Sequence, residues 1–148
     1  MSRKRLRILL DTSFLLPSLG FETDREILET MPCLINHEIH YSDLSLLEAM
    51  WKIMKHIKGR EEIDIVLRGV DLLRRTFKHE ELDERSVEIA FEMYAKGHRD
   101  LIDNLLYGIS VSKQLSFLTI DKELLQFIKN KSFTNISISP DDIKNYCI

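Results

Sequence analysis

Cysteine, proline and glycine are all scarce in this chain of 148 residues. It contains two cysteines, three prolines and five glycines, so we expect mostly regular elements joined by short connections. The cysteines, Cys33 and Cys147, form no C-x-x-C pair and no zinc-type spacing with histidine. This usage favours a reducing compartment, and the cytoplasm is the expected place of action.

Long apolar runs are also missing from the sequence. No segment approaches the roughly 18 apolar residues that a membrane-spanning helix needs. Four of the first seven residues are basic, but the apolar run that follows them is too short for the core of a signal peptide. We therefore expect no attachment to a membrane.

The composition that remains suits a folded protein. Hydrophobic residues make up 44% of the chain and charged residues 30%, which argues against disorder. The length fits one domain of ordinary size, so we predict a single domain over residues 1–148. A net charge of −3 counts slightly against a nucleic-acid binder. It does not exclude RNA, because the acids of a metal site would contribute to that charge.

Strand-like and helix-like segments alternate along the chain. Strands are predicted at 7–11, 38–42, 116–119 and 135–139. Helices are predicted at about 23–31, 44–58, 61–76, 83–96, 100–114 and 121–129, with a helical turn after residue 11 and a short helix from residue 140. Strands separated by helices are typical of parallel sheets. We therefore predict a three-layer α/β fold, in which helices flank a parallel β-sheet of about four to five strands.

Acidic residues stand at the ends of these predicted strands. Asp11 closes the first strand, Asp121 follows the third, and Glu48 lies one turn into the helix after the second. Asp103 begins the helix that leads to the third strand. Because ligands of parallel α/β sheets bind beyond the carboxyl ends of the strands, all four acids can converge on one cleft. Carboxylates gathered in this way repel each other and need a cation, and oxygen ligands favour Mg²⁺ or Mn²⁺.

Each acid also has a purely structural interpretation. The chain has 24 Asp and Glu residues, so an acid near a strand end is common. Asp11, Asp103 and Asp121 can cap a helix or favour the positive end of its dipole. Glu48 is harder to explain in this way, because Leu46, Leu47, Ala49 and Trp51 surround it. The functional interpretation depends on all four acids occurring in order.

Three segments of the chain resemble the PIN domain family, and the resemblance covers nearly its whole length. Residues 8–13 resemble the opening strand of the family, with its acid and the hydroxyl residues that follow. Residues 41–48 resemble the segment that carries the second acid. Residues 103–121 resemble the C-terminal signature, in which an acid begins a helix and a strand then ends in Thr-x-Asp. The resemblance implies a PIN-like fold and a ribonuclease activity.

The resemblance also implies which residues carry that activity. Asp11, Glu48, Asp103 and Asp121 match the acids that bind Mg²⁺ or Mn²⁺ and catalyse hydrolysis of the RNA phosphodiester bond. Bound metal can polarise a phosphoryl oxygen and activate a water, which is the chemistry that such hydrolysis requires.

Four further residues are candidates for supporting roles. Ser13 and Thr119 match positions whose hydroxyl groups support the site, and Asp100 is a candidate for an extra acid one turn before Asp103. Arg99 stands next to Asp100, where it is a candidate for binding an RNA phosphate at the rim.

The resemblance leaves the biological role and the partners open. Many PIN proteins are VapC-type toxins, which pair with an antitoxin protein and form homodimers, whereas others process RNA. RNA as the substrate, a homodimer and an antitoxin partner are therefore the implied expectations. Trp51 and Met54 lie at helical spacing after Glu48, where we expect them in the core or at an interface.

Other classes of protein fit the motifs less well. A phosphatase of the haloacid-dehalogenase type needs a second acid two residues after Asp11, where Ser13 stands. A response-regulator receiver needs a late lysine after a strand, but Lys122 is predicted to begin a helix. The Gly-x-Gly-x-x-Gly motif of Rossmann proteins is absent after the first strand. The remaining alternative is a catalytically silent PIN-like module that binds RNA or protein.

Overall fold

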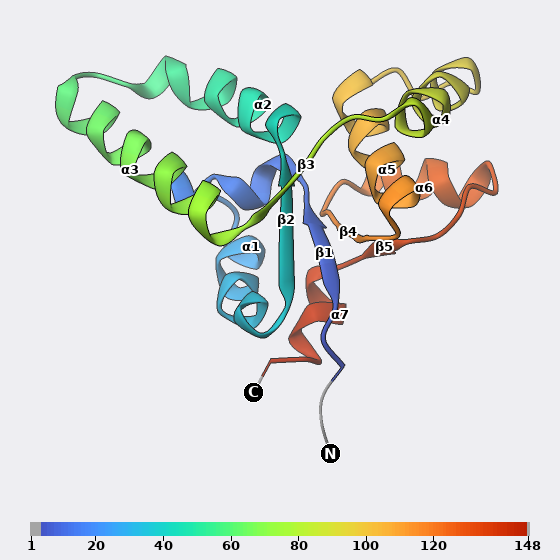
Figure 1. Ribbon diagram of the computed structural model, residues 1–148, viewed down its shortest axis with the longest axis horizontal. Coiled ribbons are helices and arrows are strands. Elements are labelled where there is room, and N and C mark those ends of the chain that lie inside the picture. The colour runs from blue at the N-terminus through green and yellow to red at the C-terminus, as the bar shows by residue number, and fades with distance from the viewer. Residues whose placement is uncertain (1–3, 148) are drawn as a thin grey trace.

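A computed structural model describes residues 4–147 of the chain. Its five strands form one sheet in the order β3-β2-β1-β4-β5, and every neighbouring pair is parallel. The strands are β1 (Arg7–Leu10), β2 (Glu38–Ser42), β3 (Lys78–Glu80), β4 (Ser116–Leu118) and β5 (Ser137–Ile138). Helices cover both faces of this sheet, which confirms the predicted three-layer architecture (Figure 1).

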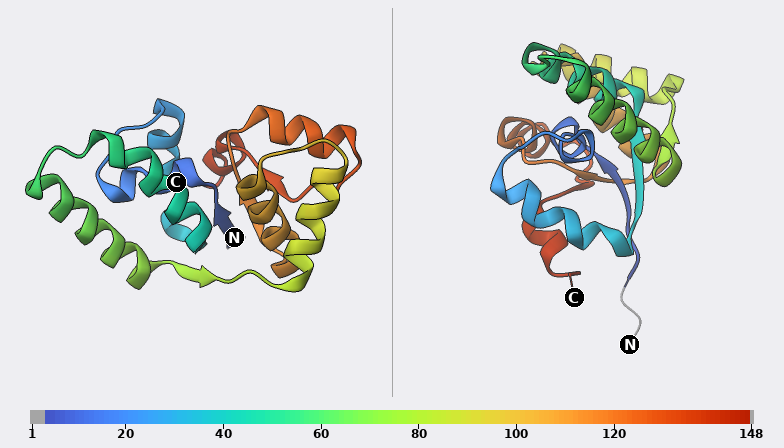
Figure 2. Two further views of the ribbon diagram at one scale, coloured as in Figure 1. Left: turned by 90° about the horizontal axis from the view of Figure 1, so that it is seen from above. Right: turned by 90° about the vertical axis from the view of Figure 1, so that its left-hand side faces the viewer.

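The helices divide into two groups, one on each face of the sheet (Figure 2). One group contains α1 (Arg25–Thr30), α2 (Asp43–Ile53), α3 (Arg60–Thr76) and α7 (Pro140–Lys144), together with the short 3-10 helices η1 (Thr12–Leu15), η2 (Pro17–Leu19), η3 (Met31–Asn36) and η4 (Met54–His56). The other group contains α4 (Glu84–Ala95), α5 (Leu101–Lys113) and α6 (Lys122–Asn130).

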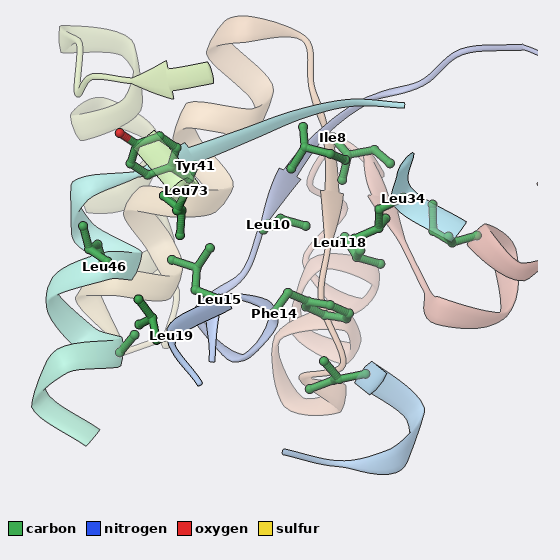
Figure 3. Packing of buried hydrophobic residues seen from close by; sticks show 14 of the residues in the cluster. Ile8, Leu10, Phe14, Leu15, Leu19, Leu34, Tyr41, Leu46, Leu73 and Leu118 are labelled. Atoms are coloured by element: carbon green, nitrogen blue, oxygen red, sulfur yellow. The ribbon is translucent and has the colours of Figure 1, made fainter. Parts of the chain in front are cut away.

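Strand β1 lies in the middle of the sheet and is buried from both sides. Ile8 and Leu10 point into the cluster that includes side chains of α1, α2 and α3, shown in Figure 3. Leu9 points the opposite way, into the cluster formed with α4, α5 and α6. Successive side chains of a strand alternate between faces, so a strand covered on both sides must be apolar throughout. This explains the continuous apolar run before Asp11.

Helices α4 and α5 pack closely against each other at Gly108. A Cβ atom at Gly108 would lie 2.5 Å from the backbone oxygen of Ser86, so no larger residue fits without movement. Asp83 adds a polar link between the two helices, because its carboxylate accepts hydrogen bonds from the Ser86 hydroxyl (2.6 Å) and the Ser112 hydroxyl (2.6 Å). The segment that carries Asp103 is therefore firmly fixed on this face of the sheet.

The edge strand β3 was not predicted from the sequence, because charged side chains rather than apolar ones connect it to β2. The ring of His40 lies between two carboxylates, with Glu38 at 2.8 Å and Glu80 at 2.7 Å. The ammonium of Lys78 lies 3.1 Å from Glu38. These pairs join β2 to β3 without the hydrophobic alternation by which short strands are recognised.

Two other predictions about the elements differ from the structure. The helix predicted at 44–58 ends at Ile53, and the next turn is the 3-10 helix η4. Trp51 and Met54 are 70% and 66% exposed, so the prediction that they belong to the core is wrong. Their place at an interface stays a prediction.

Cys33 and Cys147 form a disulfide that ties η3 to the C-terminal segment. The two residues are 114 positions apart, and no local pattern indicates the pairing. The disulfide removes the basis on which cysteine usage favoured a reducing compartment. Separately, none of the helices in residues 4–147 has the length and apolar character that crossing a bilayer demands.

Candidate active site

The order of the strands creates a crevice beside β1. From β1 the sheet extends through β2 to β3 on one side and through β4 to β5 on the other. Helices leave the carboxyl ends of β1 and β4 on opposite faces, and in parallel α/β sheets such a switch point is where ligands bind. A cleft of about 240 Å³ lies there, lined by Asp11, Thr12, Ser13, Glu48, Lys52, Asp100, Asp103, Ile120 and Asp121.

This cleft contains all four acids that the sequence singles out. Asp11 follows β1, Glu48 projects from α2, Asp103 lies in the first turn of α5, and Asp121 caps α6. Asp100, the candidate extra acid, lines the same cleft. The fold therefore brings together carboxylates from four separate segments, as the parallel topology predicts. Their roles in catalysis and metal binding stay predictions.

Hydrogen bonds fix the position of Asp11. One of its oxygens, Oδ1, accepts from the backbone N–H of Thr12 at 2.7 Å, and Oδ2 accepts from the hydroxyl of Thr119 at 2.6 Å. The Thr119 oxygen in turn accepts from the backbone N–H of Asp121 at 3.0 Å. Thr119 is fully buried, so its hydroxyl serves as a rigid link between the acid after β1 and the acid after β4.

Asp103 occupies an electrostatically unfavourable position in the cleft. Its side chain is nearly buried, and this burial raises its pKa to about 9, with contributions from the charges of Asp11 and Asp100 and from a hydrogen bond with Asp121. Burial also raises the pKa of Asp11. The raised pKa means that a nearby cation would favour the ionised form of Asp103. A site that suppresses the ionisation of its own acids is typical of a cation-binding cleft.

The donor chemistry of the cleft fits Mg²⁺ or Mn²⁺, because both ions prefer carboxylate oxygens. Thr12 lines the cleft, and its hydroxyl is buried without a hydrogen-bond partner in the described chain. The arrangement of the side chains fits less well. Within residues 4–147, no group of three or more His, Cys, Asp or Glu side chains is positioned to hold a metal ion. Binding an ion would require Asp103 and Asp121 to give up their mutual hydrogen bond.

The loop before α5 is held in place by a pair of buried polar residues. Nδ1 of His98 lies 2.6 Å from Oδ1 of Asn104, and the amide of Asn104 donates to the backbone oxygen of His98 at 2.7 Å. Asp100 follows in this loop and accepts from the backbone N–H of Asp103 at 3.0 Å. His98 therefore has a structural role, in which it fixes the turn that carries two of the acids.

Of the other predicted residues, Ser13 lines the cleft and Arg99 does not. Ser13 lines it and is partly buried. Arg99 does not line it, since its guanidinium lies 4.4 Å from the centre of the Tyr94 ring and is exposed. Sequence reasoning missed Lys52, the one basic side chain among the described residues that line the cleft. The available signal was its spacing, four residues after Glu48 on the same helix.

Comparisons with known proteins agree with this fold. A family model described as PIN domain matches residues 8–130. The fold is similar to FitAcB from Neisseria gonorrhoeae, with a TM-score of 0.67 and 13% identity over 90% of this chain and 97% of that one. It is also similar to a toxin–antitoxin complex from Klebsiella pneumoniae (TM-score 0.62, 15% identity, 90% of this chain and 97% of that one). A third similar structure is the sarcin–ricin-loop-cleaving toxin VapC20 of Mycobacterium tuberculosis (TM-score 0.62, 16% identity, 86% and 96%). Among curated proteins no sequence matches the chain.

Proposed function

The chain belongs to the PIN domain family, and from this premise we propose that it is a ribonuclease that hydrolyses RNA phosphodiester bonds with Mg²⁺ or Mn²⁺. The observation that supports this most strongly is the acidic cleft at the switch point of the sheet. Carboxylates from four segments meet there, and burial raises the pKa of two of them. Such a cluster costs stability unless it binds cations, which makes a purely structural role unconvincing.

In this proposal the four predicted acids are both the metal ligands and the catalytic groups. These are Asp11, Glu48, Asp103 and Asp121. A bound divalent cation would supply charge neutralisation and Lewis acidity to the phosphoryl group and the attacking water. The supporting residues are Ser13, Thr119 and Asp100.

The residues of the chain contribute the orientation of the acids. The hydroxyl of Thr119 and the backbone N–H of Thr12 hold the two oxygens of Asp11, so this carboxylate cannot rotate freely. Asp103 is held by its place in a buried helix, with only 8% of its surface exposed. Preorganised groups of this kind avoid a reorganisation cost during the reaction.

The direct test is cleavage of a generic single-stranded RNA in the presence of Mn²⁺. We expect Asp11→Asn to lower the rate by about 100-fold or more, because the carboxylate loses its charge in the centre of the site. Asp24→Asn is the matched control, since Asp24 is exposed and its side chain makes no capping hydrogen bond. Equal cleavage by the wild type and by Asp11→Asn would indicate a contaminating nuclease. No cleavage under broad conditions would favour the catalytically silent module.

Metal binding needs a separate measurement. Isothermal titration of the wild type with Mn²⁺ should show binding that largely disappears in Asp11→Ala, because Asp11 interacts electrostatically with Glu48, Asp103 and Asp121. Unchanged binding in that variant would remove the metal from the proposed site, whatever the nuclease assay shows.

We further propose a homodimer and an antitoxin protein as partner, acting in the cytoplasm on cellular RNA. Exposed apolar side chains on α2 and α3 support a protein partner, with Leu47 59%, Trp51 70% and Leu67 53% exposed. An apolar groove of about 400 Å³ runs between the same helices. Light scattering of the purified chain should give the mass of a dimer, and a Trp51→Glu variant should give that of a monomer. A monomeric wild type would contradict the homodimer.

A further inference from the structure

Lys52 holds a special position in the acidic cleft. Five carboxylates line the cleft, and Lys52 is the one basic side chain there within the described part of the chain. It projects from α2, one helical turn after Glu48. The α5 side of the cleft carries only acids, Asp100 and Asp103. The two walls of the cleft therefore differ in charge, with a cation on one wall alone.

The ammonium of Lys52 is only loosely held. Its Nζ atom lies 3.9 Å from Oε1 of Glu48, at the outer limit of an ion pair, and the Lys52 side chain is 51% exposed. Exposed pairs at this helical spacing are weak and pay the entropy of ordering a long side chain. A ligand that enters the cleft can therefore recruit this ammonium at little cost. Lysine is suited to the task, because it is a mobile point charge with three donors.

Glu48 cannot pair with Lys52 and coordinate a divalent cation with full strength at the same time. In the proposed function Glu48 is a metal ligand, and a carboxylate engaged in this way attracts a neighbouring ammonium much less. Lys52 is then a cation at the mouth of the cleft in need of an anion. The anion that must reach this cleft during RNA hydrolysis is a phosphodiester.

We propose that Lys52 binds a phosphate of the RNA substrate, so that the RNA backbone runs along the α2 wall of the cleft. This inference rests on the proposed ribonuclease function and names the side of the cleft that receives the substrate. Lys52 is a substrate-binding residue in this scheme. It supplies a positive charge to RNA and competes with metal ions for the carboxylate of Glu48.

Removing Lys52 should weaken RNA binding but not metal binding, and this difference provides the test. We expect Lys52→Met to weaken RNA binding about tenfold, because one charge-assisted hydrogen bond to phosphate is lost. The same variant should bind Mn²⁺ as tightly as the wild type or more tightly, since a competing cation has been removed. A merely structural role for Lys52 would weaken both. Lys55→Met is the matched control, because Lys55 is exposed nearby and does not line the cleft.

RNA binding is best measured by fluorescence anisotropy with an oligonucleotide of about 12 nucleotides, in Ca²⁺, at salt concentrations between about 50 and 200 mM. A gel should verify that the RNA stays intact. The slope of log affinity against log salt should become shallower by about 0.7 in Lys52→Met, the value for one contact to a single strand. Lys52→Arg should keep the slope of the wild type, and Lys55→Met should not change it. Titration calorimetry with Mn²⁺ gives the metal affinity.

The outcomes separate this inference from the proposed function. If the wild type binds and cleaves RNA while Lys52→Met keeps its affinity and its salt slope, the role of Lys52 is wrong and the ribonuclease stands. If Lys52→Met weakens RNA and Mn²⁺ binding alike, Lys52 is structural. If the wild type neither binds nor cleaves RNA, both proposals fall together.

Discussion

The helices on the two faces of the sheet are built in different ways. In α5, every residue from 103 to 110 is buried, whereas in α3 only Val66 and Leu73 are. The α2–α3 side instead exposes large apolar side chains, including Trp51 and Leu67. The acidic cleft lies between these regions, with Asp103 on the packed wall and Glu48 on the open one. The packed wall fixes the geometry of the site, and the open wall is where substrates and partners can approach.

Truncating a side chain to alanine should show the largest difference in unfolding free energy between the α5 side and the α2–α3 side. Leu106 is fully buried in α5, so Leu106→Ala should cost about 2–5 kcal/mol of unfolding free energy. Leu67 in α3 is 53% exposed, so in the Trp51→Glu background, where the chain is expected to be a monomer, Leu67→Ala should change stability by less than about 0.5 kcal/mol. Urea denaturation of both variants measures this. Similar losses in both would mean that the α2–α3 side is packed against something that its exposure does not show.

Adding a methyl group tests the packed wall from the other direction. Gly108→Ala should destabilise the protein by about 1–3 kcal/mol, because the new Cβ would meet the backbone of Ser86. Gly59, which precedes α3, has no atom within 4 Å of such a Cβ, so Gly59→Ala should have an effect of only a few tenths of a kcal/mol, about 0.3. Thermal unfolding distinguishes the two. A more stable Gly108→Ala would show that α4 and α5 are less tightly joined than their contact indicates.

Lowering the pH should weaken the contact that Asp83 makes between α4 and α5. Hydrogen bonds from the hydroxyls of Ser112 and Ser86 hold the pKa of this carboxyl well below its usual range. A lowered pKa in the folded state stabilises the protein above the unfolded value, near pH 4, and this contribution is lost as the pH falls toward the folded pKa. Asp83→Asn should therefore cost about 1 kcal/mol at neutral pH.

The dependence on pH supplies the check for Asp83. The difference in unfolding free energy between the wild type and Asp83→Asn, measured between about pH 7 and pH 2, should stay constant at first and narrow progressively below about pH 4. A constant gap over that range would show that charge on Asp83 does not join α4 to α5. Exposed Asp24→Asn serves as the control, and its curve should follow the wild type throughout.

The sequence predicts most of the fold where apolar patterns are strong. The boundaries of β1, α5 and α6 are correct to about one residue, because an acid marks one end of each element: Asp11 after β1, Asp100 before α5 and Asp121 before α6. Strand β3 could not be found, since its residues 78–80 are polar and pair through charges. The partnership of Cys33 and Cys147 was equally hidden, because only the tertiary fold brings these residues together.

At the candidate site too, some residues can be predicted from local sequence patterns, whereas other features depend on the tertiary fold. Strand ends pointed to Asp11 and Asp121, because a parallel sheet gathers such residues by its topology alone. The raised pKa of Asp103 depends on its burial in the folded chain, which no local pattern reveals. Lys52 was overlooked because a lysine four residues after a glutamate is an ordinary feature of exposed helices.

The bond between Cys33 and Cys147 makes most of the chain a covalently closed ring. A protease that cuts one exposed loop inside this ring would leave its two fragments joined. On a gel without reductant the nicked protein would run near its full mass, and a thiol would release the pieces. If activity is lost after limited digestion, the cause would be the cut in the loop itself, because both fragments remain attached.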